Sequence, residues 1–457
     1  MAGLAAKKSE YKRMCRMKRS GQLVITGKRI LKQFVVVSVF LLASVAPAAS
    51  LLRSKTAGGQ QWTRFRGPNG QGISYAETIP IKWTQKDYNW KVKLPGGGHS
   101  SPVIWGDKVF LTSGDQKTSR GMLLALRVSD GKVLWRKEYA LTRYLMNSSN
   151  SYATATPAVD GDHVYTLWAT ANETILVALD HNGEEVWQST FGGVNSQHGP
   201  GISPIVVNDV VVFTHEHERI VNDARSAWIA IDRKSGKRRW KLERQTRGKT
   251  SYSTPCVYSQ GTDVPLLVFT SFAHGMTGVD PSSGAVVWEA KSVFTSRIVS
   301  SPVIAGELLI GTCGDGSSGK RLIAVQPGRG GKSAEPTEVY KIENRLVPYV
   351  TTSLAKDGLL FTFHDRGDIC CLRSATGEQL WSEKPAGPFY GSPVWVNGKL
   401  YCITKKGEVV VIKADSTYEL LAVNPLGEES YATPAVAGGK MYLRTYSHLI
   451  SIGGRKE

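Results

Sequence analysis

The stretch LVALDHNGEEVW (residues 176–187) decides the fold, because the same order of residue types recurs along the chain. It predicts an apolar strand, a turn rich in Gly, Asp and Ser, and a second strand that ends in tryptophan. Four further copies are LLALRVSDGKVLW (123–135), WIAIDRKSGKRRW (228–240), MTGVDPSSGAVVW (276–288) and ICCLRSATGEQLW (369–381). We expect Tyr340 and the Leu420–Leu421 pair to replace the tryptophan in two weaker copies. The chain is therefore built from one repeated supersecondary unit.

Each unit begins with a Ser-Pro or Thr-Pro pair followed by an apolar strand, a short turn and a second strand. The seven pairs are Ser101-Pro102, Thr156-Pro157, Ser203-Pro204, Thr254-Pro255, Ser301-Pro302, Ser392-Pro393 and Thr433-Pro434, and an eighth copy, Thr352-Ser353, lacks the proline. Proline has no backbone donor and is tolerated at strand starts and edges. Four short strands every 40 to 55 residues or so are typical of a β-propeller.

The last unit is incomplete, since only three strands follow Thr433-Pro434. The segment YNWKVKLPG near the N-terminus offers the missing fourth strand, with Trp90 at the tryptophan position. We therefore predict an all-β, eight-bladed β-propeller of four-stranded antiparallel blades, whose last blade is completed by the N-terminal strand. This closure leaves no open sheet edge between the first and last blades. The structural tryptophans, expected to pack between blades, are Trp90, Trp135, Trp187, Trp240, Trp288 and Trp381.

The first 48 residues have the pattern of a secretory signal peptide. Ten Lys or Arg and one acidic residue precede the apolar run FVVVSVFLLASVA and a small-residue cleavage site. We assign residues 1–48 to the signal, 49–61 to a linker and 62–454 to the propeller, with no transmembrane segment in the mature chain. The predicted location is the periplasm or the extracellular medium; an uncleaved N-terminal membrane anchor is the alternative.

Charge and cysteine content exclude some function classes. The chain has a formal net charge of +19, but the mature part shows no concentrated basic stripe, so nucleic-acid binding is not expected. The adjacent Cys370 and Cys371 align with Leu124 and Ala125 of another copy. We interpret both as small apolar strand residues. No disulfide framework is predicted.

The repeat resembles that of the quinoprotein-like, PQQ-repeat propeller family. The pattern A-x-D-x-x-[TS]-G-x-x-x-W is best seen from Ala178 to Trp187 and from Ala230 to Trp240. The opening WTRFRGPNGQG, residues 62–72, is similar to the start of exported members of unassigned role. The resemblance implies the fold, but not one function. The family includes dehydrogenases that use pyrroloquinoline quinone (PQQ) and cofactor-free members that bind other proteins.

One face of the predicted propeller gathers most of the titratable side chains. It carries the loops from each fourth strand to the next first strand and from second to third strands. Histidines and tyrosines concentrate there, and His215 and His217 could share one side of a strand as weak candidates for a metal pair. The predicted ligand-binding face comprises His198, His215, Glu216, His217, His274, His364, Asp365, Tyr390, Tyr431 and His448.

The leading functional hypothesis is an exported, non-enzymatic scaffold, expected to be monomeric, that binds another protein or an extended ligand and needs no cofactor. No catalytic residue is assigned, because no segment matches a dehydrogenase active-site motif and the blades are too short for cofactor-covering insertions. The alternative is a dehydrogenase that oxidises an alcohol or a sugar with PQQ and Ca²⁺. A third hypothesis is a metal-dependent hydrolase centred on His215 and His217.

Overall fold

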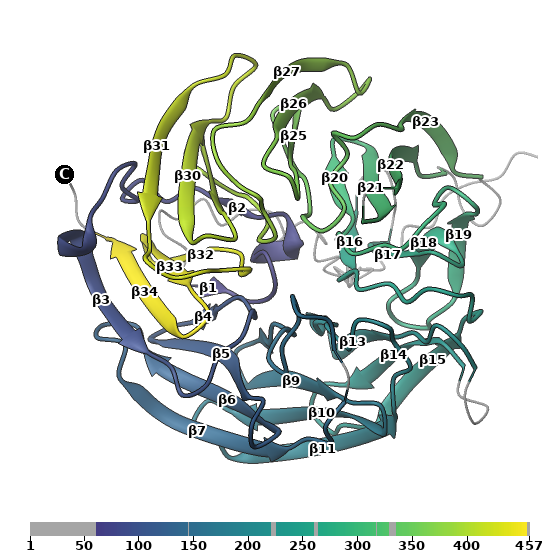
Figure 1. The fold of residues 1–457 in the computed structure, drawn as a ribbon. Coiled ribbons are helices and arrows are strands. Elements are labelled where there is room, and N and C mark those ends of the chain that lie inside the picture. Colours follow the sequence, from purple (N-terminus) through teal and green to yellow (C-terminus); the bar gives the residue numbers. More distant parts are fainter. Residues whose placement is uncertain are drawn as a thin grey trace, which may run out of the picture. The chain divides into compact units, whose positions relative to one another are not determined.

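Eight antiparallel sheets follow one another around a ring, and the chain colours run in order around it (Figure 1). The structure is a computed structural model that describes residues 61–144, 146–220, 225–259, 264–316, 318–328 and 335–454. All of them belong to one compact unit, Ser54–Glu457. The predicted signal peptide and residues 49–60 lie outside the described residues. No helix among the described residues is long and apolar enough to cross a membrane.

The first four blades follow the chain order from inner to outer strand. Blade 1 is β4 (Val103–Trp105), β5 (Lys108–Asp115), β6 (Arg120–Arg127) and β7 (Val133–Ala140). Blade 2 is β8 (Ala158–Val159), β9 (His163–Ala169), β10 (Glu173–Asp180) and β11 (Glu185–Gly192). Blade 3 is β12 (Ile205–Val207), β13 (Val210–His215), β14 (Ala227–Asp232) and β15 (Arg238–Glu243). Blade 4 is β16 (Cys256–Tyr258), β17 (Leu266–Ser271), β18 (Gly275–Val279) and β19 (Val286–Ala290).

The other four blades keep this order, except that the outer strand of the last one comes from the N-terminal part. Blade 5 is β20 (Val303–Ala305), β21 (Leu308–Asp315), β22 (Ser318–Gln326) and β23 (Thr337–Ile342). Blade 6 is β24 (Leu354–Lys356), β25 (Leu359–Phe363), β26 (Ile369–Arg373) and β27 (Gln379–Glu383). Blade 7 is β28 (Val394–Val396), β29 (Lys399–Ile403), β30 (Glu408–Lys413) and β31 (Leu420–Pro425). Blade 8 is β32 (Ala435–Ala437), β33 (Lys440–Arg444), β34 (His448–Gly453) and β3 (Tyr88–Lys93).

The predicted ring closure is confirmed, because β3 pairs antiparallel with β34 and Trp90 lies opposite Ser451. Arg444 of β33 reinforces the junction. It is fully buried and donates to the backbone carbonyl oxygens of Ser100, at 2.9 Å, and Thr112, at 2.7 Å, both in blade 1. One side chain thus joins the last blade to the first.

Five of the six repeated tryptophans link their own blade to the turn of the next one, whereas the buried indole nitrogen of Trp288 has no hydrogen-bond partner among the described residues. The indole Nε1 of Trp135 donates to the carbonyl of His181 at 3.0 Å, and Trp187 does the same to Arg233. In blade 5 the hydroxyl of Tyr340 donates to the carbonyl of Ser374 at 2.9 Å, as expected for a residue that replaces tryptophan. Equivalent bonds join Trp90 to Val128, Trp240 to Pro281 and Trp381 to Asp415.

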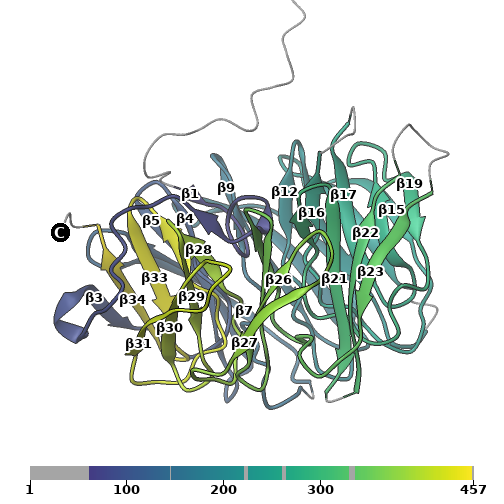
Figure 2. The ribbon, with the colours of Figure 1, turned by 90° about the horizontal axis from the view of Figure 1, so that it is seen from above.

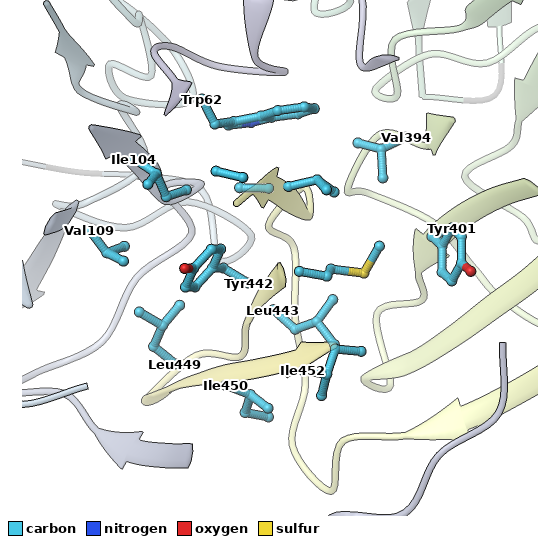
Figure 3. Packing of buried hydrophobic residues seen from close by; sticks show 14 of the residues in the cluster. Trp62, Ile104, Val109, Val394, Tyr401, Tyr442, Leu443, Leu449, Ile450 and Ile452 are labelled. Carbon is cyan, nitrogen blue, oxygen red and sulfur yellow. The ribbon is translucent and has the colours of Figure 1, made fainter. Parts of the chain in front are cut away.

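The small residue of the repeat lies opposite the tryptophan of its own blade. Ala178 pairs with Trp187 and Cys371 with Trp381, and a bulge follows both. In blade 7 this register position holds Ala422, so the expected Leu420–Leu421 substitute is wrong, and both leucines lie just before the position. The N-terminal segment supplies apolar bulk there instead: Ile79 and Trp83 join the large cluster that spans blades 7, 8 and 1, part of which is shown in Figure 3.

Hydroxyl groups of the Ser/Thr-Pro pairs connect the inner strands into a ring. The backbone N–H of Ser101 in blade 1 donates to Thr156 Oγ1 of blade 2 at 2.9 Å, and Thr433 of blade 8 donates to Ser101 Oγ at 3.1 Å. Seven such bonds between described residues are 2.9 to 3.1 Å long. Thr352 keeps the bond although its proline is lost. The hydroxyl, as well as the proline, therefore explains the repeated pair.

The two faces of the ring differ in their connections. We call the face with the second-to-third strand loops and the blade-to-blade loops the loop face, and the opposite face the turn face. Residues 62–74, the channel segment, run along the inner edges of the first strands. β1 (Gln61–Trp62) pairs with the end of β4, and β2 (Ile73–Ser74) pairs in parallel with the end of β28. Because these strand ends lead into turns, the segment lies towards the turn face (Figure 2).

Hydrogen bonds join the channel segment to four more blades. They run from Val159 N–H to Thr63 O, from Ile304 N–H to Gln71 Oε1, from Arg66 to Ser353 O and between Asn69 and the backbone of Val257. Asn69 belongs to the short 3-10 helix η2 (Pro68–Gly70). A second one, η3 (Gln85–Asp87), begins with Thr84 as a capping residue. The segment therefore occupies the channel mouth on the turn face.

The motif WTRFRGPNGQG is explained by this position. Trp62 packs on Gly67, where φ is +68° and a Cβ would come within 2.5 Å of the indole. Arg66 lies against Gly72, where a Cβ would be 3.1 Å from the guanidinium. Only glycine avoids both the clash and the left-handed strain. Burial lowers the pKa of Arg66 to about 9, and the side chain is satisfied in part by the carbonyl of Ser353.

Candidate functional site

Arg297 is the centre of a polar network on the loop face. It lies in the loop between β19 and β20, and its side chain is 3% exposed. Nη1 donates to His198 Nε2 at 2.7 Å, and Nη2 donates to Gln197 Oε1 at 3.0 Å and to Glu218 Oε1 at 2.8 Å. Asp315 lies 3.9 Å from Nη1. One guanidinium thus connects loops from blades 3 and 5 across blade 4.

The protonation state of His198 follows from this contact. Burial, followed by the nearby charge of Arg297, lowers the pKa of His198, so the neutral ring is favoured. Because Nε2 accepts from Arg297, the proton of the neutral ring is on Nδ1. His198 therefore presents a fixed donor, and Arg297 acts as the residue that orients it.

A depression of about 560 Å³ adjoins the network. It is lined by Asn195, Ser196, Gln197, Glu218, Arg219 and Gly248. Tyr252 supports its wall, since its hydroxyl lies 2.6 Å from Ser196 Oγ and 3.3 Å from Thr250 Oγ1. Amide, hydroxyl and charged groups therefore converge on one concave surface, which is suited to hydrogen bonding with a polar ligand or a protein segment.

His215, Glu216 and His217 come to the loop face but are buried. His215 Nε2 bonds to the Gly192 carbonyl at 2.9 Å, and His217 Nδ1 accepts from the N–H of Asn195 at 3.3 Å. Burial lowers the pKa of both histidines, that of His217 to about 4. Their ring centroids are 4.8 Å apart. Both rings thus already hold loop backbone, and the metal pair stays a prediction.

Glu216 and His274 lie in the same blade-to-blade interface. Burial raises the pKa of Glu216, which accepts from Trp228 Nε1 at 2.9 Å and from the N–H of Ser251 at 3.2 Å. His274 Nε2 accepts from the N–H of Gln245 at 2.8 Å, so its Nδ1 carries the proton and points to Glu289 at 3.5 Å, which also pairs with Arg244. These groups face one another rather than solvent.

A third group joins His364 and Asp365 to Lys320. Lys320 Nζ is 2.8 Å from His364 Nε2 and 2.9 Å from Asp365 Oδ1. His364 is fully buried, and burial lowers its pKa. The structure does not bring His364 together with His215, because they lie in different blades with the Arg297 network between their loops.

Half-buried aromatic rings lie over blades 7, 8 and 1. The ring centroids of His99 and Tyr431 are 4.6 Å apart and nearly parallel, and those of Tyr431 and Tyr390 are 5.1 Å apart. Lys405 Nζ lies over both tyrosines, at 4.3 and 5.0 Å. We call His99, Tyr390, Tyr431 and Lys405 the aromatic row. It offers a stacked, cationic surface to a partner.

His448 contacts Glu428 and Ser447, but the three do not form a proton-relay chain. Both Glu428 Oε2 and Ser447 Oγ lie 3.0 Å from the same nitrogen, Nδ1. A relay needs the acid and the nucleophile on opposite ring nitrogens. Burial alone would raise the pKa of Glu428, but hydrogen bonds from Ser447, Thr445 and His448 outweigh it and hold that pKa at about 2.

The described residues do not fit a PQQ–Ca²⁺ pair. Among them no group of three or more His, Cys, Asp or Glu side chains is arranged to hold a metal ion. Glu218 and Asp315, two carboxylates of the loop face, are engaged by Arg297 and Lys249. Cys370 and Cys371 are buried free thiols within β26. We therefore derive no reaction step through this cofactor.

The predicted ligand-binding face leaves out the residues that organise the site. Arg297, Glu218 and Tyr252 were not among the predicted site residues, although each follows or precedes a strand on the loop face. The predicted His198, Asp365, Tyr390, Tyr431 and His448 are half-buried there, and the other five are buried. A signal was present: an arginine in a loop with no acidic residue nearby in sequence needs a partner from another blade.

Comparison with known proteins supports the fold. A family model described as "Outer membrane protein assembly factor BamB" matches residues 56–241, 146–348 and 342–452. The protein of that name from Yersinia pestis is 19% identical over 357 residues, which are 77% of this chain and 74% of that protein.

Two solved structures share the architecture. BamB from Moraxella catarrhalis has a TM-score of 0.56 and 13% identity, covering 80% of this chain and 97% of that one. The quinohemoprotein alcohol dehydrogenase from Comamonas testosteroni has a TM-score of 0.63 and 12% identity, covering 89% and 82%. At these identities the structures show the fold alone. The family model, however, covers almost the whole described propeller, and the chain belongs to the family described as outer membrane protein assembly factor BamB.

Proposed function

We propose that this protein is an exported, non-enzymatic scaffold that binds another protein through its loop face. The observation that carries the proposal is the Arg297 network, which fixes loops of separate blades beside a concave polar surface. A preformed surface lowers the entropy cost of binding a partner. The relatives named as assembly factors agree with such a role. We place the protein in the periplasm or outside the cell and regard it as a monomer.

The position of the channel segment favours the loop face over the turn face. Residues 62–74 bond to inner strands at the turn-face mouth, so a ligand that uses the channel mouth has to approach from the loop face. The loops of the loop face also carry the aromatic row and the Arg297 network.

Site-specific photocrosslinking tests the proposal. A photoreactive amino acid at Gln197 or Arg219, both exposed at the depression, should give adducts with a partner in the cell envelope. The same amino acid at Lys132 or Ser283, exposed on the turn face, is the matched control. Equal adduct yields from the two faces would contradict the proposal.

The PQQ-dependent alternative predicts a different result. Titration of the purified protein with PQQ and Ca²⁺ should then raise the melting temperature. At a ligand concentration a hundredfold above Kd, binding adds about 2.7 kcal/mol to the free energy of unfolding. Dye-linked oxidation of an alcohol or a sugar would accompany it. Both results together would replace the scaffold proposal by an oxidoreductase.

A further inference from the structure

Several basic side chains on the loop face have no counter-ion among the described residues. Nine Lys or Arg are exposed in its loops and form no ion pair with another described residue. We call them the basic rim: Lys93, Arg143, Arg219, Arg247, Lys291, Arg345, Arg366, Lys384 and Lys406. They belong to loops of almost every blade, so the positive charge surrounds the depression and the aromatic row. A concave protein surface lined by charges of one sign has a strong electrostatic potential, because the protein around it has a low dielectric constant. This potential attracts a partner of the opposite charge.

Acidic side chains on the same face are mostly neutralised within the protein. Glu218 pairs with Arg297 at 2.8 Å, and Asp315 pairs with Lys249 at 2.5 Å. Asp365 pairs with Lys320 at 2.9 Å. The exposed carboxylates that remain there are Glu383 and Glu429. The net field of the loop face is therefore positive, although the mature chain is a mixture of both signs.

The turn face is balanced differently, since many of its acids pair with bases close by in sequence. Asp232 is 2.7 Å from Arg239, and it also caps its own turn through Ser235. Asp415 is 3.0 Å from Lys413 in the same way. The aspartates required by the turn chemistry thus compensate the bases of this face. The asymmetry between faces follows from the repeat, because its obligatory aspartates lie on the turn side only.

We infer that the loop face docks an acidic protein segment, whose carboxylates meet the basic rim. This inference rests on the proposed scaffold function and specifies the chemistry of its partner. The half-buried tyrosines of the aromatic row and the amide and hydroxyl groups of the depression suit a polypeptide, which offers both side chains and backbone groups. An anionic lipid surface is less suited. Among the described residues of this face, Ile220 is the single large apolar side chain that is exposed and could insert into lipid.

Binding of labelled poly-L-glutamate of about 20 residues tests the inference by fluorescence anisotropy. The loop-face triple variant Arg366→Gln, Lys384→Gln and Lys406→Gln removes three charges from neighbouring loops. The matched control, Lys132→Gln, Lys234→Gln and Lys237→Gln, removes three exposed charges from the turn face. We expect the loop-face variant to weaken binding about tenfold at 50 mM NaCl and the control by less than about twofold, since rim charges act through a screened field.

The outcomes are distinct. Equal weakening by both triple variants would mean that only the net charge matters, and would overturn the inference. So would stronger binding to vesicles with 30% phosphatidylglycerol than to poly-L-glutamate, because the face would then be a membrane surface. Failure of the scaffold function looks different: poly-L-glutamate would bind at the loop face, yet photocrosslinking from Gln197 and Arg219 would yield no adduct above the turn-face control.

Discussion

The hydrogen bonds of Asn69 in the channel segment lead to a testable prediction. Its side chain imitates a strand neighbour, because Nδ2 donates to the carbonyl of Val257 and Oδ1 accepts from the N–H of the same residue, both at 2.7 Å. Val257 lies in the innermost strand of blade 4, where these backbone groups otherwise have no sheet partner. Asn69 also has a positive φ of 51°, a conformation that glycine adopts without strain.

These two facts give opposite expectations for Asn69→Gly. Relief of backbone strain alone predicts a protein at least as stable as the parent. Loss of two hydrogen bonds of about 1 kcal/mol each predicts a loss of about 2 kcal/mol. Asn69→Ala loses the same bonds and adds about 1 kcal/mol of left-handed strain, so about 3 kcal/mol in total. We expect the order parent, Gly variant, Ala variant, from most to least stable.

Thermal unfolding followed by circular dichroism measures the effect. An unfolding entropy of about 2.1 cal/mol/K per residue over about 400 residues converts 1 kcal/mol into roughly 1.2 °C. The Gly variant should therefore melt about 2 °C below the parent and the Ala variant between 3 and 4 °C below it, as order-of-magnitude values from the same scaling. A Gly variant that melts at or above the parent temperature would refute the claim that the channel segment stabilises the ring through its side chains.

Three other changes test the blade junctions and the aromatic row. Thr433→Val leaves the N–H of Ser392 without its acceptor and should cost about 1 to 2 kcal/mol by thermal melting, whereas Thr433→Ser should cost little. Tyr340→Phe loses the bond to Ser374 and should cost about 1 kcal/mol, while Tyr340→Trp should keep it, again by melting temperature. Burial and Arg444 lower the pKa of His99 to about 3, so its neutral form stabilises the fold above pH 6.5 and this contribution is lost as pH falls from 6.5 towards 3. Between pH 7 and pH 5 the loss is about 2 kcal/mol, and His99→Phe should remove that part of the pH dependence of melting.

The fold could be predicted from the sequence because its determinants are local and repeated. The tryptophan, the small residue opposite it and the turn glycine all lie within one blade and recur at a fixed spacing. Even the closing strand could be found, since Trp90 is the same repeated tryptophan as in the other copies. Blade 7, by contrast, has the same bulge but a turn one residue longer, since Val411 pairs with Ala422 whereas Cys371 pairs with Trp381 in blade 6. This longer turn moves the tryptophan position past the Leu420–Leu421 pair.

The candidate site could be predicted only to the level of a face. Topology alone places the loops on one side, and the histidines of the predicted face lie in or next to those loops, whereas His163 and His181 lie at turns of the other face. Which of them reach solvent depends on how loops from different blades pack, and His215 and His364 are buried by neighbours far away in sequence. Arg297 and His198 are 99 residues apart and meet because two loops cross over the blade between them.

The two faces of the ring differ in the same way, because the turn face is fixed by contacts that every repeat needs and the loop face is not. The turn face is determined by what every repeat needs, an aspartate and a glycine that make the turn and a carbonyl that receives the tryptophan of the previous blade. Its residues are therefore committed to the fold, and the channel segment closes its mouth. The loop face has no such repeated requirement beyond the Ser/Thr ring, so its lengths and charges are free to differ between blades. A surplus of exposed bases that form no ion pair among the described residues is consistent with selection for a partner rather than for stability, and this is why the binding experiments above concentrate on that face.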